Sequence, residues 1–175
     1  MDYYELFQSK EVENPIVVMK LEQAAYTYGM KKAEFEALER LKVAYYSGRE
    51  FEEPCDILTE PTFLVSELIK KTLTLYDKEI LFKGVQLFPT AEESGSYPLY
   101  WVPLFRELDC LHKDTMKQDN GLLKNLVLAK EKIAGHSVFR IGGILEYKVA
   151  VSLPVAESIL RRRPYGVGLR KIEVR

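Results

Sequence analysis

Two stretches of the chain carry the same order of structural signals, and this internal repeat limits the fold more than any other feature of the sequence. Residues 63–66 and 149–152 each form a short apolar run that ends in serine. Apolar positions at helical spacing follow, and a serine side chain can accept a backbone N–H bond where a helix begins. A glycine, Gly84 or Gly166, then accompanies a second apolar strand. We therefore predict two related strand–helix–strand units.

The rest of the chain supplies more strands and one more helix. Residues 16–19 are a β-prone run after a turn signal, and the apolar spacing of residues 31–45 predicts an amphipathic helix. Strands are expected at 63–65, 80–88, 138–141, 147–151 and 167–174, the last with a bulge or a slip in register near Arg170. Helices should begin at 66 and 152.

These elements predict an α+β fold, in which one mixed or antiparallel sheet is covered by helices. We expect a single domain over residues 1–175. Within it, residues 1–60 would hold the N-terminal strand and the amphipathic helix. Residues 61–175 would hold the repeated strand–helix–strand core.

Charge and cysteine content exclude several classes of protein. The 25 Lys and Arg residues nearly balance the 26 Asp and Glu residues, so the net charge of -1 gives no global attraction to nucleic acid or to anionic lipid. We expect neither as a partner. Cys55 and Cys110 are the only cysteines, too few for a disulfide framework, and they favour a reducing cytoplasm. We also expect no signal peptide, since the start of the chain lacks a basic, then apolar, segment, and no membrane anchor, since no apolar stretch approaches the roughly 20 residues of a membrane helix.

Cys110 and His112 are the only close Cys/His pair, and a thiolate beside an imidazole can act as nucleophile and base. The sequence around them marks neither a third orienting group nor an oxyanion site. The sequence Gly135-His136-Ser137 lacks the second glycine of a nucleophile elbow, and the other glycines do not fit a nucleotide-binding loop. We expect packing roles here, no catalytic residues, no metal and no cofactor.

The densest aromatic and proline stretch is 97–105, which contains Tyr97, Tyr100 and Trp101. Large rigid aromatic side chains anchor many protein interfaces. They are equally suited to a core, and flanking prolines are typical of a loop or an edge strand. Both readings stay open for this stretch.

Charge is unevenly distributed along the chain. Residues 34–60 carry eight acidic and three basic residues, a balance of -5, and residues 161–175 carry six basic residues and one acidic residue, a balance of +5. Both stretches are compatible with solvated surfaces. The acidic stretch, with Glu50, Glu52 and Glu53, is also a candidate surface for a basic protein partner.

Several short segments resemble the bacterial immunity proteins numbered eleven in the polymorphic-toxin catalogue. The segments are Phe63–Glu67, Phe82–Val85, Val138–Ile141, Val149–Ser152 and Tyr165–Val167, so the resemblance covers roughly residues 60–175. The family is described as α+β with a prominent tryptophan and a Gly-x-Ser element. Trp101 and Gly135-His136-Ser137 are the positions that could fill these roles.

The resemblance implies a cytoplasmic, non-enzymatic protein that neutralises a toxin by covering its active surface. Glu50, Glu52, Glu53, Tyr97, Tyr100 and Trp101 are then the candidate partner-binding residues, and the partner would be a basic toxin domain. Two alternatives belong to other classes: a small enzyme that uses Cys110 and His112 or a carboxylate pair, and a structural or regulatory homodimer formed through residues 97–105.

Overall fold

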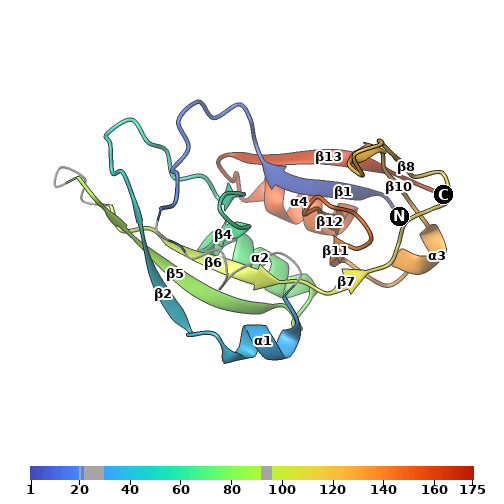
Figure 1. The fold of residues 1–175 in the computed structure, drawn as a ribbon, viewed down its shortest axis with the longest axis horizontal. Coiled ribbons are helices and arrows are strands. Elements are labelled where there is room, and N and C mark those ends of the chain that lie inside the picture. Colours follow the sequence, from blue (N-terminus) through green and yellow to red (C-terminus); the bar gives the residue numbers. More distant parts are fainter. Residues whose placement is uncertain (20, 22–29, 92–95) are drawn as a thin grey trace.

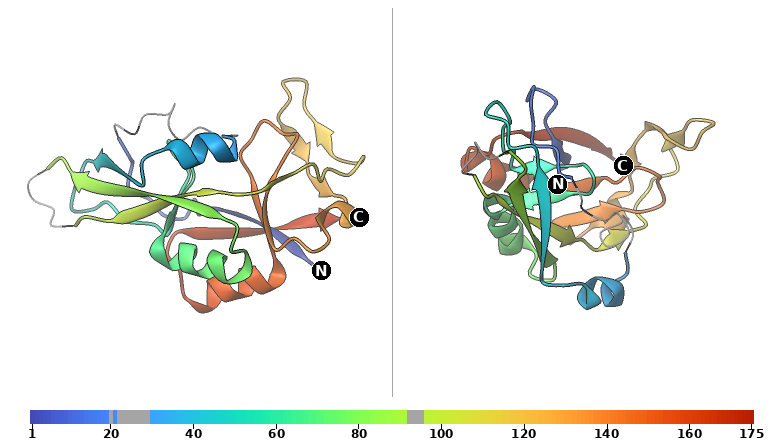
Figure 2. Two further views of the ribbon diagram at one scale, coloured as in Figure 1. Left: turned by 90° about the horizontal axis from the view of Figure 1, so that it is seen from below. Right: turned by 60° about the vertical axis from the view of Figure 1, so that its left-hand side comes forward.

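Two β-sheets lie side by side in the computed structural model, which describes residues 1–19, 21, 30–91 and 96–175 (Figure 1). Helices α2 (Glu67–Tyr76) and α4 (Leu153–Arg161) contact each other and lie on the same side of the sheets, whereas α1 (Lys32–Ala37) lies on the opposite side (Figure 2, left). The fold is α+β, as the sequence predicts.

The five-stranded sheet contains the first predicted unit and has the strand order β2-β5-β6-β4-β3. Strand β4 leads through Ser66 into α2, and Ser66 Oγ accepts a bond from the Ile69 N–H at 3.4 Å. Strand β6 lies between β4 and β5 and is antiparallel to both, whereas β2 is parallel to β5. The elements of this half are α1 (Lys32–Ala37), β2 (Leu41–Tyr46), β3 (Ile57–Leu58), β4 (Leu64–Ser66), α2 (Glu67–Tyr76), β5 (Leu81–Pro89) and β6 (Leu99–Leu104).

The six-stranded sheet contains the second unit and has the order β10-β13-β1-β12-β11-β7. Strand β12 leads through Ser152 into α4, and β1 lies between β12 and β13, antiparallel to both. Strands β8 and β9 form a separate pair. The elements are β1 (Tyr3–Gln8), β7 (Glu107–Leu108), β8 (Met116–Lys117), β9 (Leu123–Asn125), β10 (Val127–Leu128), α3 (Lys130–Ile133), β11 (Val138–Ile141), β12 (Val149–Ser152), α4 (Leu153–Arg161) and β13 (Val167–Val174).

The two sheets repeat one arrangement strand by strand. Strands β2, β5, β6, β4 and β3 of one sheet correspond in order and direction to β10, β13, β1, β12 and β11 of the other. The register agrees as well: Tyr100 of β6 lies opposite Ser66, and Tyr3 of β1 lies opposite Ser152. One difference follows from the chain order. The middle strand of the first half follows β5 in a hairpin, but the middle strand of the second half comes from the N-terminal segment.

Equivalent hydrogen bonds tie down the two middle strands. The Tyr100 hydroxyl donates to the Cys55 carbonyl at 2.8 Å, two residues before β3. The Tyr3 hydroxyl donates to the His136 carbonyl at 2.7 Å, two residues before β11, and also contacts the Ile133 carbonyl at 3.0 Å. Both tyrosine side chains are buried. The internal repeat therefore extends from the strand order to individual polar contacts.

A shared apolar core joins the two halves. It contains Val65 and Ile69 from the first unit together with Val151 and Ile159 from the second. The opposite face of each sheet has a cluster of its own, with Phe35 of α1 in the five-stranded half. Since α2 and α4 contribute to the same core, the two repeated units should unfold together.

The structure corrects the predicted helix over residues 31–45. Only Lys32–Ala37 is helical, and Leu38 has an extended backbone with ψ of 154°. Leu41–Tyr46 instead form β2, which pairs with β5 along its whole length. The apolar spacing fits a helix, but pairing with a distant strand outweighs this local preference.

Four smaller expectations also change. Residues 16–19 form no strand of their own, although isolated bridges involve Pro15 and Met19. The strands predicted for one sheet belong to two sheets. Strand β13 pairs with β1 over six consecutive residues without a shift, so no bulge lies near Arg170. Gly84 lies within β5 whereas Gly166 precedes β13, so the two glycines are not equivalent.

Candidate functional site

One face of the five-stranded sheet is only partly covered. Helix α2 packs over β4 and part of β6 on this face, and the ends of β2 and β5 extend beyond the helix (Figure 2, left). Register places alternate residues of β2, β5 and β6 on this face, because Val43 lies opposite Gln86 and Gln86 lies opposite Leu99. The exposed apolar side chains on it, with the fraction of each that is exposed, are Leu41 53%, Val43 43%, Phe88 38%, Tyr97 58% and Leu99 37%. We call these five residues the apolar face.

A neighbouring segment extends the apolar face. Met19 forms a bridge with Tyr45 of β2, and Pro15 forms one with Glu53, so residues 15–19 lie along the end of this edge strand and the segment that follows it. Val17 has the same side-chain direction as Met19 and is 60% exposed, whereas its neighbours Ile16 and Val18 are buried against the other face of the sheet. Exposed apolar side chains therefore continue across four adjacent segments, an arrangement typical of surfaces that bind other proteins.

Trp101 lies where α2 meets the apolar face. Its side chain is partly buried against the shared core, and Lys70 Nζ of α2 lies 3.1 Å from its ring centroid. The indole Nε1 is buried and has no hydrogen-bond partner among the residues that the structure describes. The protein environment thus covers much of Trp101, which belongs to the margin of the apolar face.

The two tyrosines proposed with Trp101 have different environments. Tyr97 is exposed, and its ring contacts Phe88 at 5.5 Å between centroids. Tyr100 points to the other side of the sheet and is only 2% exposed. Burial raises the pKa of the Tyr100 phenol, and the carbonyl of Cys55 accepts its hydrogen bond. Tyr97 can contact a partner, whereas Tyr100 stabilises the core.

Two acidic loops lie at the edge of the sheet where β2 and β5 end. Residues 9–15 and 47–56 contact each other through bonds from Glu53 N to the Asn14 carbonyl (2.8 Å) and from Ile16 N to the Glu53 carbonyl (3.1 Å). Together they carry six acidic and two basic residues, a balance of -4. The Ala91 N–H bonds to the Ser47 carbonyl at 3.1 Å, which brings the second loop to the end of β5.

The three predicted glutamates do different things within these loops. Glu50 is exposed. Glu52 closes the turn after β2, since its carboxylate accepts bonds from Ser47 Oγ at 2.6 Å and from Gly48 N at 2.9 Å. Glu53 accepts a bond from the Tyr165 hydroxyl and thereby raises the pKa of that phenol to about 12. Of the three, only Glu50 has no hydrogen bond or ion pair with another residue that the structure describes.

The arrangement at Cys110 and His112 does not support nucleophilic catalysis. Cys110 is buried in the core, and this burial raises the pKa of its thiol to about 11. At neutral pH the thiol is therefore protonated and a poor nucleophile. His112 Nδ1 accepts a bond from the Asp114 N–H at 3.2 Å. Within the described ranges, no group of three or more His, Cys, Asp or Glu side chains could hold a metal ion.

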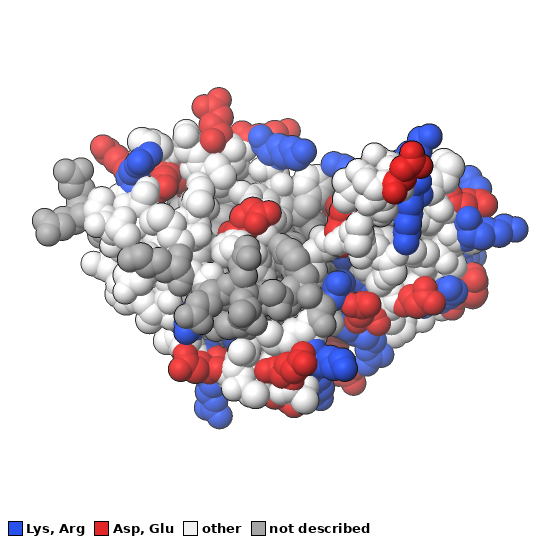
Figure 3. Space-filling view, viewed as in Figure 1, with Lys and Arg blue, Asp and Glu red and all other residues white. Residues whose placement is uncertain are grey.

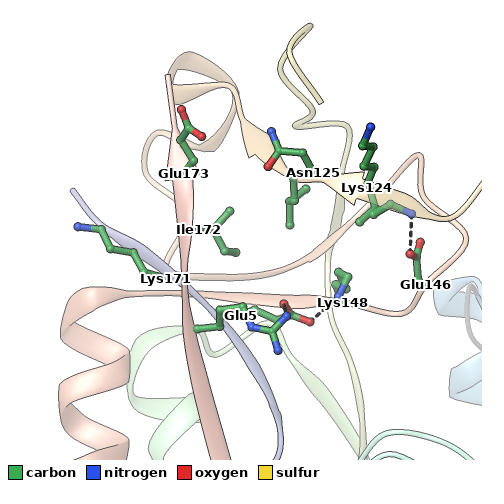
Figure 4. A pocket seen from close by; sticks show the side chains of 11 residues that line it. Glu5, Lys124, Asn125, Glu146, Lys148, Lys171, Ile172 and Glu173 are labelled. Atoms are coloured by element: carbon green, nitrogen blue, oxygen red, sulfur yellow. Dashed lines mark hydrogen bonds and ion pairs between the residues drawn. The ribbon is translucent and has the colours of Figure 1, made fainter. Parts of the chain in front are cut away.

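A polar hollow lies on the six-stranded half of the protein, whereas the apolar face lies on the five-stranded half. Its volume is about 350 Å³, and it is open to solvent between β9 and the outer face of β1 and β13 (Figure 4). Lys148 Nζ and Glu5 Oε1 form an ion pair of 2.6 Å on its floor. On the side of the molecule seen in Figure 3, acidic and basic side chains lie side by side over this half.

Tyr97 is the one residue of the apolar face that the sequence predicts as a partner-binding residue. The sequence assigns Leu41 and Val43 to a helix, and it does not predict the hollow. No protein-family model matches the chain, and a search of curated proteins finds no match. Among the described residues, no helix is long and apolar enough to cross a membrane.

Proposed function

We propose that this chain is a cytoplasmic binding protein that neutralises a toxin by covering its surface, as the resemblance to immunity proteins implies. The observation that carries the proposal is the apolar face beside the acidic loops. Five large apolar side chains on one sheet face stay 37% to 58% exposed, which a protein partner would bury.

The charge around the apolar face favours a basic partner. The two loops at its edge have a balance of -4, and Glu13 and Glu50 are exposed within them. Complementary charge speeds association and selects partners, while burial of the apolar side chains would slow dissociation. A toxin domain with an apolar patch bordered by Lys and Arg residues fits this surface. Such a protein acts by steric occlusion and needs no catalytic residue.

The proposal is tested by measuring binding between the purified chain and a purified, basic toxin domain encoded next to it. Val43→Lys places a charge in the apolar face, and Leu145→Lys is the matched control because Leu145 is 71% exposed outside this face. We expect Val43→Lys to weaken binding at least tenfold through faster dissociation, and Leu145→Lys to have no effect.

Charge variants test the second part of the surface. Glu13→Lys with Glu50→Lys should slow association and make it less dependent on salt, whereas Glu131→Lys on α3 should not. Glu52 and Glu53 are left unchanged because they bond to the folded loops. Lack of binding at micromolar concentration would overturn the proposal. A concentration-dependent dimer that Val43→Lys dissociates would replace it with the homodimer.

A further inference from the structure

The polar hollow on the six-stranded half is a site that the proposed function does not use. Glu5 of β1 lies on its floor with a side chain only 13% exposed, paired with Lys148, which is 20% exposed. Arg170 of β13 lies on the other side of Glu5, with 3.9 Å between Arg170 Nη1 and Glu5 Oε2. Arg170, Glu5 and Lys148 come from adjacent segments and therefore form a row of charged side chains across the sheet. Figure 4 shows the ion pair between Glu5 and Lys148 in this row.

The other half of the protein shows what this position looks like when the chain fills it. Glu5 follows Tyr3 by two residues, and its counterpart Val102 follows Tyr100 by two. Val102 is 6% exposed in the cluster that contains Phe35 of α1. Thus α1 packs over the sheet in the first half, whereas the second half leaves a hollow of about 350 Å³ over the charged row.

The counterpart of Arg170 supports the same comparison. It is Lys83 of β5, because Ile172 and Val85 both lie opposite the middle-strand tyrosines. Lys83 Nζ donates to the Glu36 and Leu38 carbonyls at 3.1 Å and 2.7 Å, so the end of α1 satisfies it. Arg170 remains 65% exposed beside the hollow.

A carboxylate at the wall of the hollow is only half satisfied. Glu146 Oε1 accepts a bond from the Leu123 N–H at 2.8 Å. Glu146 Oε2 is buried and has no hydrogen-bond partner among the described residues. A buried carboxylate oxygen without a donor is costly, and a ligand that supplies an N–H donor would remove that cost. Lys124 of β9 lies nearby on the rim (Figure 4).

We infer that this hollow binds a small zwitterion, a molecule with one carboxylate and one ammonium group such as a free α-amino acid. The ammonium group would donate to Glu146, and the carboxylate would accept from Arg170. A simple anion would face the carboxylates of Glu5 and Glu146, and a simple cation would face Lys148 and Arg170. A molecule that carries both charges matches both signs of the lining, and the volume suits a small ligand.

The test uses the whole chain and three probes in separate titrations: L-serine, L-glutamate and L-lysine. Binding is followed by amide chemical shifts, including those of Leu123 and Asn125, and by calorimetry. We expect at least one probe to bind saturably with a dissociation constant below about 1 mM, a free energy near -4 kcal/mol. The methyl ester and the N-acetyl form of that probe, each lacking one charge, should bind at least tenfold more weakly.

Two variants locate the site, and neither removes a core contact. Glu146→Gln keeps an acceptor for Leu123 N and removes the charge, and Arg170→Gln alters an exposed side chain. Each should weaken binding at least fivefold with an unchanged melting temperature, whereas Arg161→Gln, an exposed residue on α4, should bind as the parent chain does. The inference fails if no probe binds with a dissociation constant below about 1 mM, if both blocked forms bind equally well, or if the variants bind normally. Because no protein partner is involved, these outcomes do not depend on toxin binding.

Discussion

Removing the Tyr100 hydroxyl tests whether the two halves use equivalent contacts for stability. In Tyr100→Phe, the buried Cys55 carbonyl loses the donor that lies 2.8 Å away. In Tyr3→Phe, the His136 carbonyl loses its donor at 2.7 Å. The two changes remove one oxygen atom each from equivalent positions, so their effects can be compared directly.

The surroundings of the acceptors predict unequal costs. Cys55 is 1% exposed, so water cannot replace the lost donor, and an unsatisfied buried acceptor costs about 1–3 kcal/mol. His136 is partly exposed, and the Ile133 carbonyl keeps a bond from His136 N at 3.1 Å. We expect a loss of about 2 kcal/mol for Tyr100→Phe and about 1 kcal/mol for Tyr3→Phe. At this chain length the melting temperature should fall by about 4–8 °C and about 2–4 °C.

Urea unfolding followed by circular dichroism measures both losses, and Tyr97→Phe is the control because Tyr97 is 58% exposed. The double variant should lose about 3 kcal/mol, since the two tyrosines lie in different sheets. If Tyr100→Phe changes the free energy of unfolding by less than about 0.5 kcal/mol, as expected for the control, the argument from the buried carbonyl is wrong.

Three further predictions concern the backbone and the thiols. Gly166→Ala should destabilise the protein by more than about 2 kcal/mol, because the φ of Gly166 is +68° and an added Cβ would lie 2.5 Å from Cys55 Sγ. Gly135 also has a positive φ, +82°, but no atom lies within 4 Å of an added Cβ. Gly135→Ala should therefore cost only about 1 kcal/mol in the same unfolding assay. Cys55 and Cys110 are buried, so a thiol reagent at pH 8 should modify them slowly in the folded chain and fast in denaturant; fast reaction of both would contradict their burial. Burial raises both thiol pKa values from 9.0 to about 11, so between about pH 9 and pH 11 the unfolded chain loses thiol protons that the folded chain keeps. The free energy of unfolding should therefore be unaffected by these thiols below pH 9 and should fall as pH rises from about 9 to about 11. Replacing both cysteines by alanine should remove that part of the fall.

The repeated units are predictable because their signals are local. A serine after an apolar run, followed by apolar residues at helical spacing, specifies the start of α2 and of α4 without any distant contact. Residues 41–46 show the limit of such signals. Leu41 and Tyr45 fit the helical spacing that begins at Phe35, but the segment gains its hydrogen bonds by pairing with β5, about forty residues later. No window of sequence around β2 contains that information.

The candidate surfaces show the same limit more strongly. Side chains along β6 point alternately to the two faces of the sheet, so Tyr100 points away from the face that holds Leu99 and Trp101. The sequence alone does not tell which of the two sets is buried. At the hollow, Glu5 lies beside Lys148 and Arg170, which are more than 140 residues later in the sequence. Glu5 occupies the position that the buried Val102 occupies in the other sheet, and only the strand register of both sheets shows that the two positions are equivalent.

The position of β1 has a consequence for the order of events during synthesis. Residues Tyr3–Gln8 are made long before their neighbours β12 and β13, which end at Ser152 and Val174. At about 5–20 residues per second, the first strand waits roughly ten to thirty seconds for its partners, while the five-stranded half can already form. During that interval β1 is a free strand with unpaired backbone groups and needs protection from other chains. Strands made late in synthesis therefore complete the sheet on both sides of β1.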